Sequence, residues 1–293
     1  MTESGDGHSR EPQSQRYSPA GPRTAFFRAA RSRAIGQSRL SGAMEAYQYP
    51  YYYAIALAPS DPGREIDFFE AAIERFSKVK VNRVFELGAG TAPHLEEWHR
   101  RSYAYCGLDL SPAMIDFARE KAGRLGIGAE FILGDMRELD CDLGPFDFAY
   151  VLLGSLYVRS NHEFLDHLDR MAAVLLPGGL YLLDSFVWFR MFHDYKRSWT
   201  RRKGGVTVHT RYRAELTDAV AQTYDECLTF SVDDHGTATI IDGRVPAKVF
   251  FPQEFLSLVE LSGRFEFIGW YNDFSFTAQL KPEGRHLTLL RKR

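Results

Sequence analysis

The chain has 293 residues, of which 45% are hydrophobic, so it can build one large or two small globular domains. Its formal net charge of -2 argues against a protein whose whole surface binds polyanions. No apolar run approaches the roughly 20 residues of a membrane span, and the N-terminus has no secretory apolar region. The three cysteines lack metal-ligand spacing, which favours a reduced, cytoplasmic protein and predicts no metal site.

The first segments are polar and then unusually rich in tyrosine. Residues 1–40 carry many Ser, Gly, Pro and Arg residues, and we predict a disordered basic tail there. Residues 47–53 read Tyr-Gln-Tyr-Pro-Tyr-Tyr-Tyr. This stretch is either an aromatic seal or a lid that hydrogen-bonds a ligand, with Tyr52 as a ligand contact. After it, residues 65–77 have the apolar spacing of a helix.

The next segment combines a strand, a glycine turn and a helix. Residues 83–87 form a short apolar run, the turn Gly88-Ala89-Gly90 follows, and residues 93–101 predict a helix that starts near Pro93. This arrangement presents backbone N–H groups to a ligand. A dinucleotide fingerprint would need a third glycine where Pro93 stands. Glu86 at the strand end also disfavours a pyrophosphate.

Two further strands end in acids. Residues 103–108 are followed by Asp109, about 20 residues after the glycine turn, where an acid can accept hydrogen bonds from ribose hydroxyls. Ser111 and Pro112 then predict a helix start. Residues 129–133 end before Asp135, which on its own is most simply explained as a turn or helix cap.

The remaining core pattern is a strand over residues 146–152, a helix capped by Asn161, and a Pro-Gly-Gly turn at 177–179 before a strand at 180–184. Taken together, the glycine turn, the Gly-Leu-Asp-Leu-Ser-Pro-Ala-Met phrase at 107–114 and this Pro-Gly-Gly turn resemble class I S-adenosylmethionine-dependent methyltransferases of the small-molecule type. Ala92 departs mildly from the glycine that is commonest at its position.

The resemblance implies a Rossmann-like α/β fold with a doubly wound, seven-stranded, mostly parallel sheet. It also implies S-adenosylmethionine as the cofactor. The residues that it assigns to cofactor binding, together with the lid residue, are Glu86, Gly88, Ala89, Gly90, Asp109, Leu110, Met114, Asp135, Met136, Leu153 and Tyr52.

Past Asp184 the pattern changes to alternating runs typical of antiparallel strands. We predict that residues 186–250 form a small β cap, with turns at 233–236 and 242–243, above the carboxyl ends of the parallel strands. The methyltransferase core would comprise residues 41–185 and 251–293. Residues 252–262 predict a helix and residues 265–270 a strand, and residues 286–290 predict an antiparallel strand at the sheet edge.

Methyl transfer needs a positioned nucleophile and, for many acceptors, a base. His209, His193 and Tyr157 are the preferred base candidates, with Tyr212 and His94 behind them. The acceptor could be an N or O nucleophile of a small molecule. The basic run 190–213 leaves RNA or another polyanion as an alternative. A third alternative is a domain that binds a ligand or a partner without methyl transfer, including a homodimer formed through the aromatic cap.

Overall fold

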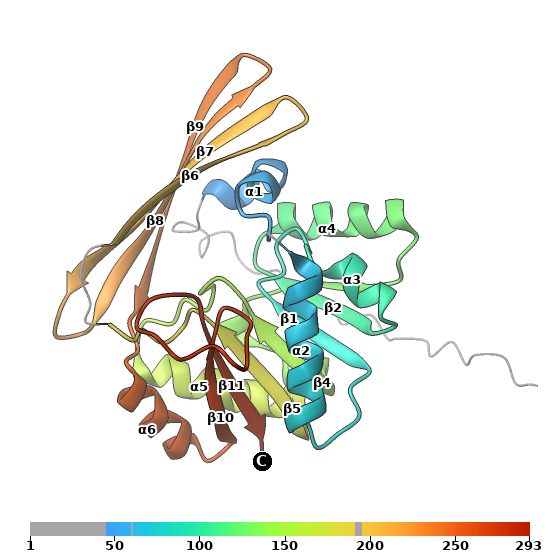
Figure 1. The fold of residues 1–293 in the computed structure, drawn as a ribbon, viewed down its shortest axis with the longest axis vertical. Helices are drawn as coiled ribbons and strands as arrows, with labels where there is room; N and C mark the ends of the chain where they lie inside the picture. Colours follow the sequence, from blue (N-terminus) through green and yellow to red (C-terminus); the bar gives the residue numbers. More distant parts are fainter. Residues whose placement is uncertain (1–44, 60, 191–194) are drawn as a thin grey trace, which may run out of the picture. The chain divides into compact units, whose positions relative to one another are not determined.

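The computed structural model describes residues 45–59, 61–190 and 195–293, so the predicted tail lies outside the described residues. Seven strands form one sheet in the order β10-β11-β5-β4-β1-β2-β3 (Figure 1). Strands β1 to β5 pair in parallel with one another, which confirms the predicted doubly wound α/β sheet. Their bounds are Arg83–Leu87 (β1), Ala104–Asp109 (β2), Glu130–Leu133 (β3), Phe146–Val151 (β4), Leu175–Asp184 (β5), Phe265–Asn272 (β10) and His286–Lys292 (β11).

The position predicted for the last strand is wrong. Strand β11 is antiparallel, as expected, but it pairs with both β5 and β10, and β10 takes the edge. Its alternating side chains are buried on both faces of the sheet: Leu287 and Leu289 pack into one core cluster, and Leu290 packs into the other. Burial on both faces is what an interior strand needs.

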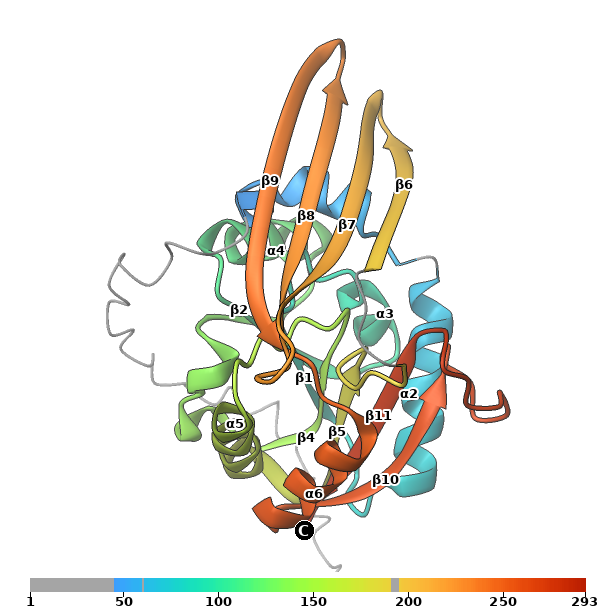
Figure 2. The same ribbon diagram turned by 90° about the vertical axis from the view of Figure 1, so that its left-hand side faces the viewer.

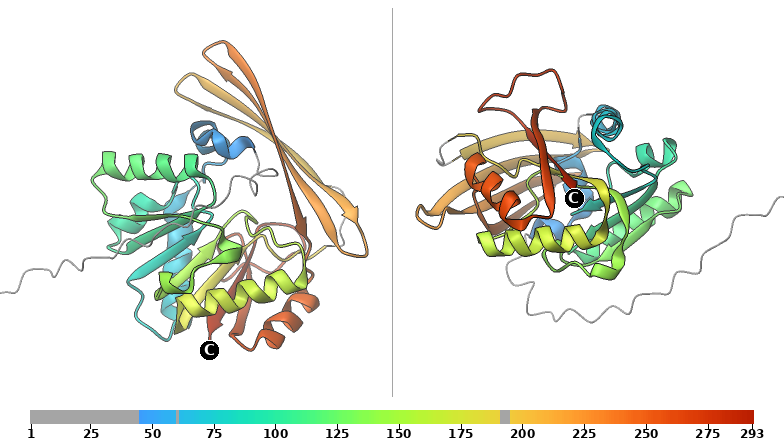
Figure 3. Two further views of the ribbon diagram at one scale, coloured as in Figure 1. Left: turned by 180° about the vertical axis from the view of Figure 1, so that it is seen from behind. Right: turned by 90° about the horizontal axis from the view of Figure 1, so that it is seen from below.

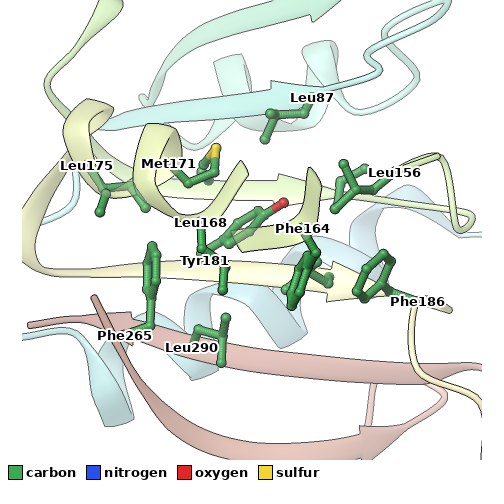
Figure 4. Close-up of a cluster of buried hydrophobic side chains, with 14 of the residues drawn as sticks. Leu87, Leu156, Phe164, Leu168, Met171, Leu175, Tyr181, Phe186, Phe265 and Leu290 are labelled. Atoms are coloured by element: carbon green, nitrogen blue, oxygen red, sulfur yellow. The ribbon is translucent and has the colours of Figure 1, made fainter. Parts of the chain in front are cut away.

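Helices cover both faces of the sheet, as Figure 3 shows. One face packs against α2 (Pro62–Phe76), α3 (Leu95–Arg100) and α4 (Pro112–Leu125). The other packs against α5 (Asn161–Val174) and α6 (Pro252–Ser262). Figure 4 shows the core under α5, where Phe164 and Met171 meet Tyr181.

Helix caps fix where two of these helices begin. The N-cap of α5 is Ser160, whose hydroxyl accepts from the N–H of Glu163, rather than the predicted Asn161. The predicted cap of α4 is confirmed, because Ser111 Oγ accepts from the N–H of Met114. The first helical residue of α4 therefore follows β2 almost at once, which keeps the end of β2 close to a helix N-terminus.

A second, four-stranded antiparallel sheet comprises β6 (Tyr195–Lys203), β7 (Val206–Asp218), β8 (Thr223–Asp234) and β9 (Thr237–Lys248), drawn in Figure 2. Strand β6 was not predicted. The predicted turn at 242–243 is wrong, because Asp242 and Gly243 pair with Thr229 and Leu228 inside the β8–β9 ladder. Cross-strand pairing thus outweighs the local turn preference of Asp-Gly.

The tyrosine-rich segment forms η2 (Glu45–Gln48) and α1 (Pro50–Ala56), and α1 lies between the four-stranded sheet and α4 (Figures 1 and 2). The indole N–H of Trp199 on β6 donates to the carbonyl of Ala56 at 2.8 Å. Two further 3-10 turns, η3 (Met136–Glu138) and η4 (Cys141–Leu143), follow β3. Over the described ranges, none of the helices has the length and apolarity to cross a membrane.

Candidate active site

The glycine turn after β1 adopts a conformation that side chains rarely allow. Gly88 and Gly90 have φ angles of 67° and 53°, and the N–H of Ala89 donates to the carbonyl of Leu108 on β2 at 2.9 Å. A Cβ added to Gly88 would stand 3.0 Å from the methyl of Met136. The missing side chain therefore lets the end of β1 approach the loop after β3 closely, and leaves backbone as the surface of the turn.

Asp109 ends β2 beside this turn and is 9% exposed. Its two oxygens each accept a backbone N–H at 2.8 Å, from Gly90 and from Ser111. Because each carboxylate oxygen has two lone pairs, one remains on each for a ligand hydroxyl. Burial raises the pKa of Asp109, although these N–H bonds lower it in part. The free acceptor positions of Asp109 fit the ribose-binding role that the sequence predicts.

In the loop after β3, the carboxylate of Asp135 already has hydrogen-bond partners within the chain. Asp135 caps η3 and pairs with Arg137 at 2.7 Å. Burial raises the pKa of Asp135, but the hydrogen bonds from Arg137 outweigh it and hold the pKa below its ordinary value. The predicted adenine contact at Asp135 would therefore share its carboxylate with Arg137.

The buried side chain of His167 fixes the backbone of Met136, which follows Asp135 in the chain. Burial lowers the pKa of His167 to about 4, so its ring is neutral. Its Nδ1–H can donate to the carbonyl of Met136 at 3.0 Å while Nε2 accepts from the hydroxyl of Tyr181 at 2.8 Å. Of the other predicted contacts, Met114 is 1% exposed at the start of α4, and Leu110 is half-buried beside Asp109.

Glu86 belongs to a buried group beneath the turn. It is 3% exposed, and its Oε2 accepts from the hydroxyls of Tyr105 at 2.5 Å and Tyr150 at 2.9 Å. His94 Nδ1 lies 3.7 Å from Glu86 Oε1, while His94 Nε2 lies 2.9 Å from Glu65. Although burial alone would lower it, the two glutamates raise the pKa of His94 to about 9. Glu86 thus faces a cation that the chain itself supplies.

The same group continues to the loop after β4. Arg285 contacts Glu65 at 2.9 Å and Asp184 at 2.7 Å. Asp184 also accepts the N–H of Leu153 at 2.7 Å, and Leu153 has a φ angle of 57° and a 46% exposed side chain. Asp184 therefore holds the backbone of Leu153, while the side chain of Leu153 stays accessible. We call Glu65, Glu86, His94, Asp184 and Arg285 the charged network.

Some tyrosines of the tyrosine-rich segment lie near the glycine turn, and another contacts the four-stranded sheet. The carbonyl of Tyr47 accepts from Ser111 Oγ at 3.0 Å, and the ring of Tyr53 would lie 3.8 Å from a Cβ added to Gly90. The hydroxyl of Tyr52 instead donates to Asp234 at 2.8 Å. The prediction for Tyr52 therefore needs correction: adjacent residues of a helix point in different directions, and it is Tyr47 and Tyr53 that lie beside the turn.

A carboxylate that sequence analysis did not single out stands across from these tyrosines. Glu226 on β8 is 7% exposed, and its two oxygens accept from Tyr157 at 2.7 Å and from Tyr212 at 2.9 Å. The hydroxyl of Tyr47 lies 3.4 Å from that of Tyr157. Burial raises the pKa of Glu226 although both phenols lower it. We call Glu226, Tyr157, Tyr212 and Tyr47 the tyrosine–glutamate cluster.

The predicted base candidates are not all brought to this cluster. Tyr157 is there, but it donates to Glu226, and burial and then Glu226 raise its pKa well above the ordinary value, so it is a poor base at neutral pH. His209 lies on the opposite side of β7 from buried Val208 and contacts Thr200 at 2.9 Å. His193 lies outside the described residues.

Glu226 could have been found from its place in an alternating run. Tyr224, Leu228 and Phe230 occupy the same inward face of β8, so Glu226 is an acid at a position of apolar periodicity. No comparable local signal marks Arg285 or Glu65, which meet His94 only through folding.

Comparisons with known proteins relate part of the chain to methyltransferases. A methyltransferase-domain family model matches residues 84–179. The chain is 27% identical over 188 residues to dTDP-4-amino-2,3,4,6-tetradeoxy-D-glucose N,N-dimethyltransferase from Saccharopolyspora spinosa, covering 58% of this chain and 73% of that protein. Two further relatives, from Geobacillus sp. and Bacillus subtilis, match over only 61% and 44% of their own lengths.

Solved structures share the fold. An S-adenosylmethionine-dependent methyltransferase from Clostridium acetobutylicum superposes with a TM-score of 0.67 at 16% identity, over 80% of this chain and 93% of that one. An amino pentose methyltransferase from Micromonospora echinaspora gives a TM-score of 0.60 at 22% identity, over 78% and 92%. At these identities the likeness is one of fold.

Proposed function

Because residues 84–179 belong to the methyltransferase-domain family within a class I methyltransferase fold, we propose that this protein transfers a methyl group from S-adenosylmethionine to an N or O nucleophile of a small molecule. The observation that carries the proposal is the position of Tyr47. Its carbonyl is bonded to Ser111 beside Asp109, and its hydroxyl lies beside Tyr157 in the tyrosine–glutamate cluster. One residue thus connects the proposed cofactor site with the proposed acceptor site.

Each side of the cofactor site has a separate task in this proposal. Asp109 binds the ribose hydroxyls, and the backbone of the Gly88–Gly90 turn allows close approach. The neutral ring of His167 holds the backbone at Met136, and Asp184 holds it at Leu153. The cofactor, when bound, supplies an electrophilic methyl group on a sulfonium. These residues orient that group rather than react with it.

The tyrosine-rich segment would act as the lid. Tyr53 packs between Gly90 and Phe230 of β8, so the segment contacts both the glycine turn and the four-stranded sheet. Its rings exclude water, which favours transfer to the acceptor over side reactions. The small-molecule acceptor is supported by the amino-sugar substrates in the names of the Saccharopolyspora and Micromonospora relatives.

Titration calorimetry tests the cofactor assignment. Wild-type protein should bind S-adenosylmethionine, and Asp109→Asn should weaken the affinity by about tenfold or more, since it removes a charge-assisted acceptor. Asp116→Asn is the matched control, because Asp116 lies on α4 with a side chain 77% exposed. Folded wild-type protein that binds no S-adenosylmethionine, or an Asp109→Asn variant that binds as tightly as wild type, would refute the assignment.

One observation favours the alternative acceptor, a polyanion such as RNA. Strand β6 exposes Lys196, Arg197, Arg201, Arg202 and Lys203, and in the described part of the chain none of them forms an ion pair with an acid. If RNA binds there, its affinity should fall steeply with salt, with a log–log slope close to the number of phosphates contacted. An affinity for RNA that does not change with salt concentration would argue against RNA as the acceptor and favour a small molecule.

A further inference from the structure

The buried carboxylate of Glu226 differs from the acids of the charged network in having no cation supplied by the described part of the chain. It differs from Asp109 and Asp147 in accepting from phenols rather than from backbone N–H groups. Over residues 45–59, 61–190 and 195–293, no Lys, Arg or His forms an ion pair with it. The titratable groups that face it are phenols, namely Tyr47, Tyr53, Tyr157, Tyr212 and Tyr224. A buried carboxylate with neutral neighbours gains strongly from an added cation or proton.

Its hydrogen bonds leave acceptor positions on both oxygens for that cation. Tyr157 and Tyr212 each donate one proton to a different oxygen, so each oxygen keeps one free lone pair. Tyrosine rings around the carboxylate also attract a cation through their faces. An ammonium group, with several N–H donors, matches both features, whereas an alcohol brings one donor and no charge.

The carboxylate also lies near the proposed cofactor site. The acids at both sites, Glu226 and Asp109, raise the pKa values of Tyr47 and Tyr53, after burial as the main cause. The carbonyl of Tyr47 is fixed by Ser111, which follows Asp109 by two residues. Tyr47 thus contacts the proposed cofactor site through its backbone and the tyrosine–glutamate cluster through its side chain.

We propose that Glu226, with Tyr157 and Tyr212, binds the amino group of the acceptor, so that the acceptor is an amine. This inference rests on the proposed function and names its acceptor class. Glu226 would also accept the proton: R–NH3⁺ and the carboxylate become R–NH2 and a neutral carboxylic acid. That transfer changes no oxidation state, and it frees the nitrogen lone pair that methyl transfer requires.

The neighbouring residue provides a control on the same strand. Asp225 is also buried, but it points to the opposite side of β8 and pairs with Arg244. Neutralising Asp225 therefore removes a buried charge from the same strand without touching the tyrosine–glutamate cluster. Any effect found at Glu226 alone cannot then be attributed to a general loss of charge in the sheet.

Carboxylate 13C NMR with small probes tests the inference on the full chain. The probes are cyclohexylammonium and glucosamine, each paired with its hydroxyl counterpart, cyclohexanol and glucose. We expect both ammonium probes, and neither alcohol, to shift the Glu226 signal. Calorimetry should find their affinity about tenfold or more weaker in Glu226→Gln and unchanged in Asp225→Asn.

Three results would overturn it: equal affinity in Glu226→Gln, equal binding of amines and alcohols, or no shift with any ammonium probe. Should Glu226→Gln fail to fold, the amine–alcohol contrast in wild-type protein decides alone. S-adenosylmethionine binding is measured on the same samples. If that binding is intact while ammonium binding is absent, the amine inference fails and the proposed methyltransferase function stands. If S-adenosylmethionine does not bind either, both fail.

Discussion

The charged network and the tyrosine–glutamate cluster are two buried acidic regions that differ in the groups that face their carboxylates. In the network, Glu65, Glu86 and Asp184 face His94 and Arg285 at 2.7 to 3.7 Å. In the cluster, Glu226 faces phenols at 2.7 and 2.9 Å. An acid whose cation is built in can fix the backbone, as Asp184 does at Leu153. An acid without one is sensitive to any charge that enters, which is the property expected of a binding site.

Removing the cation from the charged network should have the largest effect. Arg285→Met would leave Glu65 and Asp184 buried with less compensation, and the free energy of unfolding should fall by about 3–5 kcal/mol. Urea unfolding followed by fluorescence measures it. Arg264→Met is the control, because its pair with Asp169 is more than half exposed and should contribute less than about 1 kcal/mol. Equal losses of unfolding free energy in both variants would mean that Arg285 stabilises the fold no more than an exposed ion pair does.

Raising the pH should weaken the same network through His94. The pKa of His94 is raised from 6.5 to about 9, so its contribution is complete below pH 6.5 and is lost as the pH rises through 9. The expected loss is about 3 kcal/mol, from roughly 1.4 kcal/mol for each pH unit between the two values. Urea unfolding at both ends of this range should show a loss in wild-type protein that is absent from His94→Gln. If the free energy of unfolding depended on pH in the same way in wild-type protein and in His94→Gln, His94 would not be the group responsible.

Removing one phenol from the cluster should have a smaller effect. Tyr212→Phe deletes a hydrogen bond to a buried carboxylate, which is worth about 1.5–3 kcal/mol when the acid is ionised. Tyr52→Phe is the chemically matched control: its partner Asp234 is not buried, and the loss should stay below about 1 kcal/mol. Thermal unfolding of both variants compares them. A Tyr212→Phe loss no greater than that of Tyr52→Phe would mean that Glu226 does not depend on its phenols.

The sequence predicted the parts of the molecule that are local. The strand–turn–helix at Gly88, the Ser111 cap and the helix over residues 252–262 each depend on a few adjacent residues, and each is confirmed. The edge position of the last strand and the turn at Asp242 were wrong, because pairing partners distant in the chain decide them.

In the candidate site, too, the residues placed by neighbouring strands were predicted, whereas those brought together from distant parts of the chain were not. Asp109 lies beside the glycine turn because both follow neighbouring strands of one parallel sheet. Glu226 comes from a different sheet, more than 60 residues from Tyr157 along the chain, and no short-range pattern links the two. The charged network was missed for the same reason, since Glu65 and Arg285 stand near opposite ends of the described chain.

The most direct test of the difference between the two regions is a pH titration of the glutamate side chains in ligand-free protein by carboxylate 13C NMR. Burial raises the pKa of Glu226 although Tyr157 and Tyr212 lower it, whereas His94 and Arg285 outweigh burial and hold the pKa of Glu65 below its ordinary value. We predict that the pKa of Glu226 lies above, and that of Glu65 below, the ordinary value for glutamate. If Glu226 titrated at or below Glu65, a cation would already compensate it, and the account of Glu226 as the amine-binding acid would be wrong.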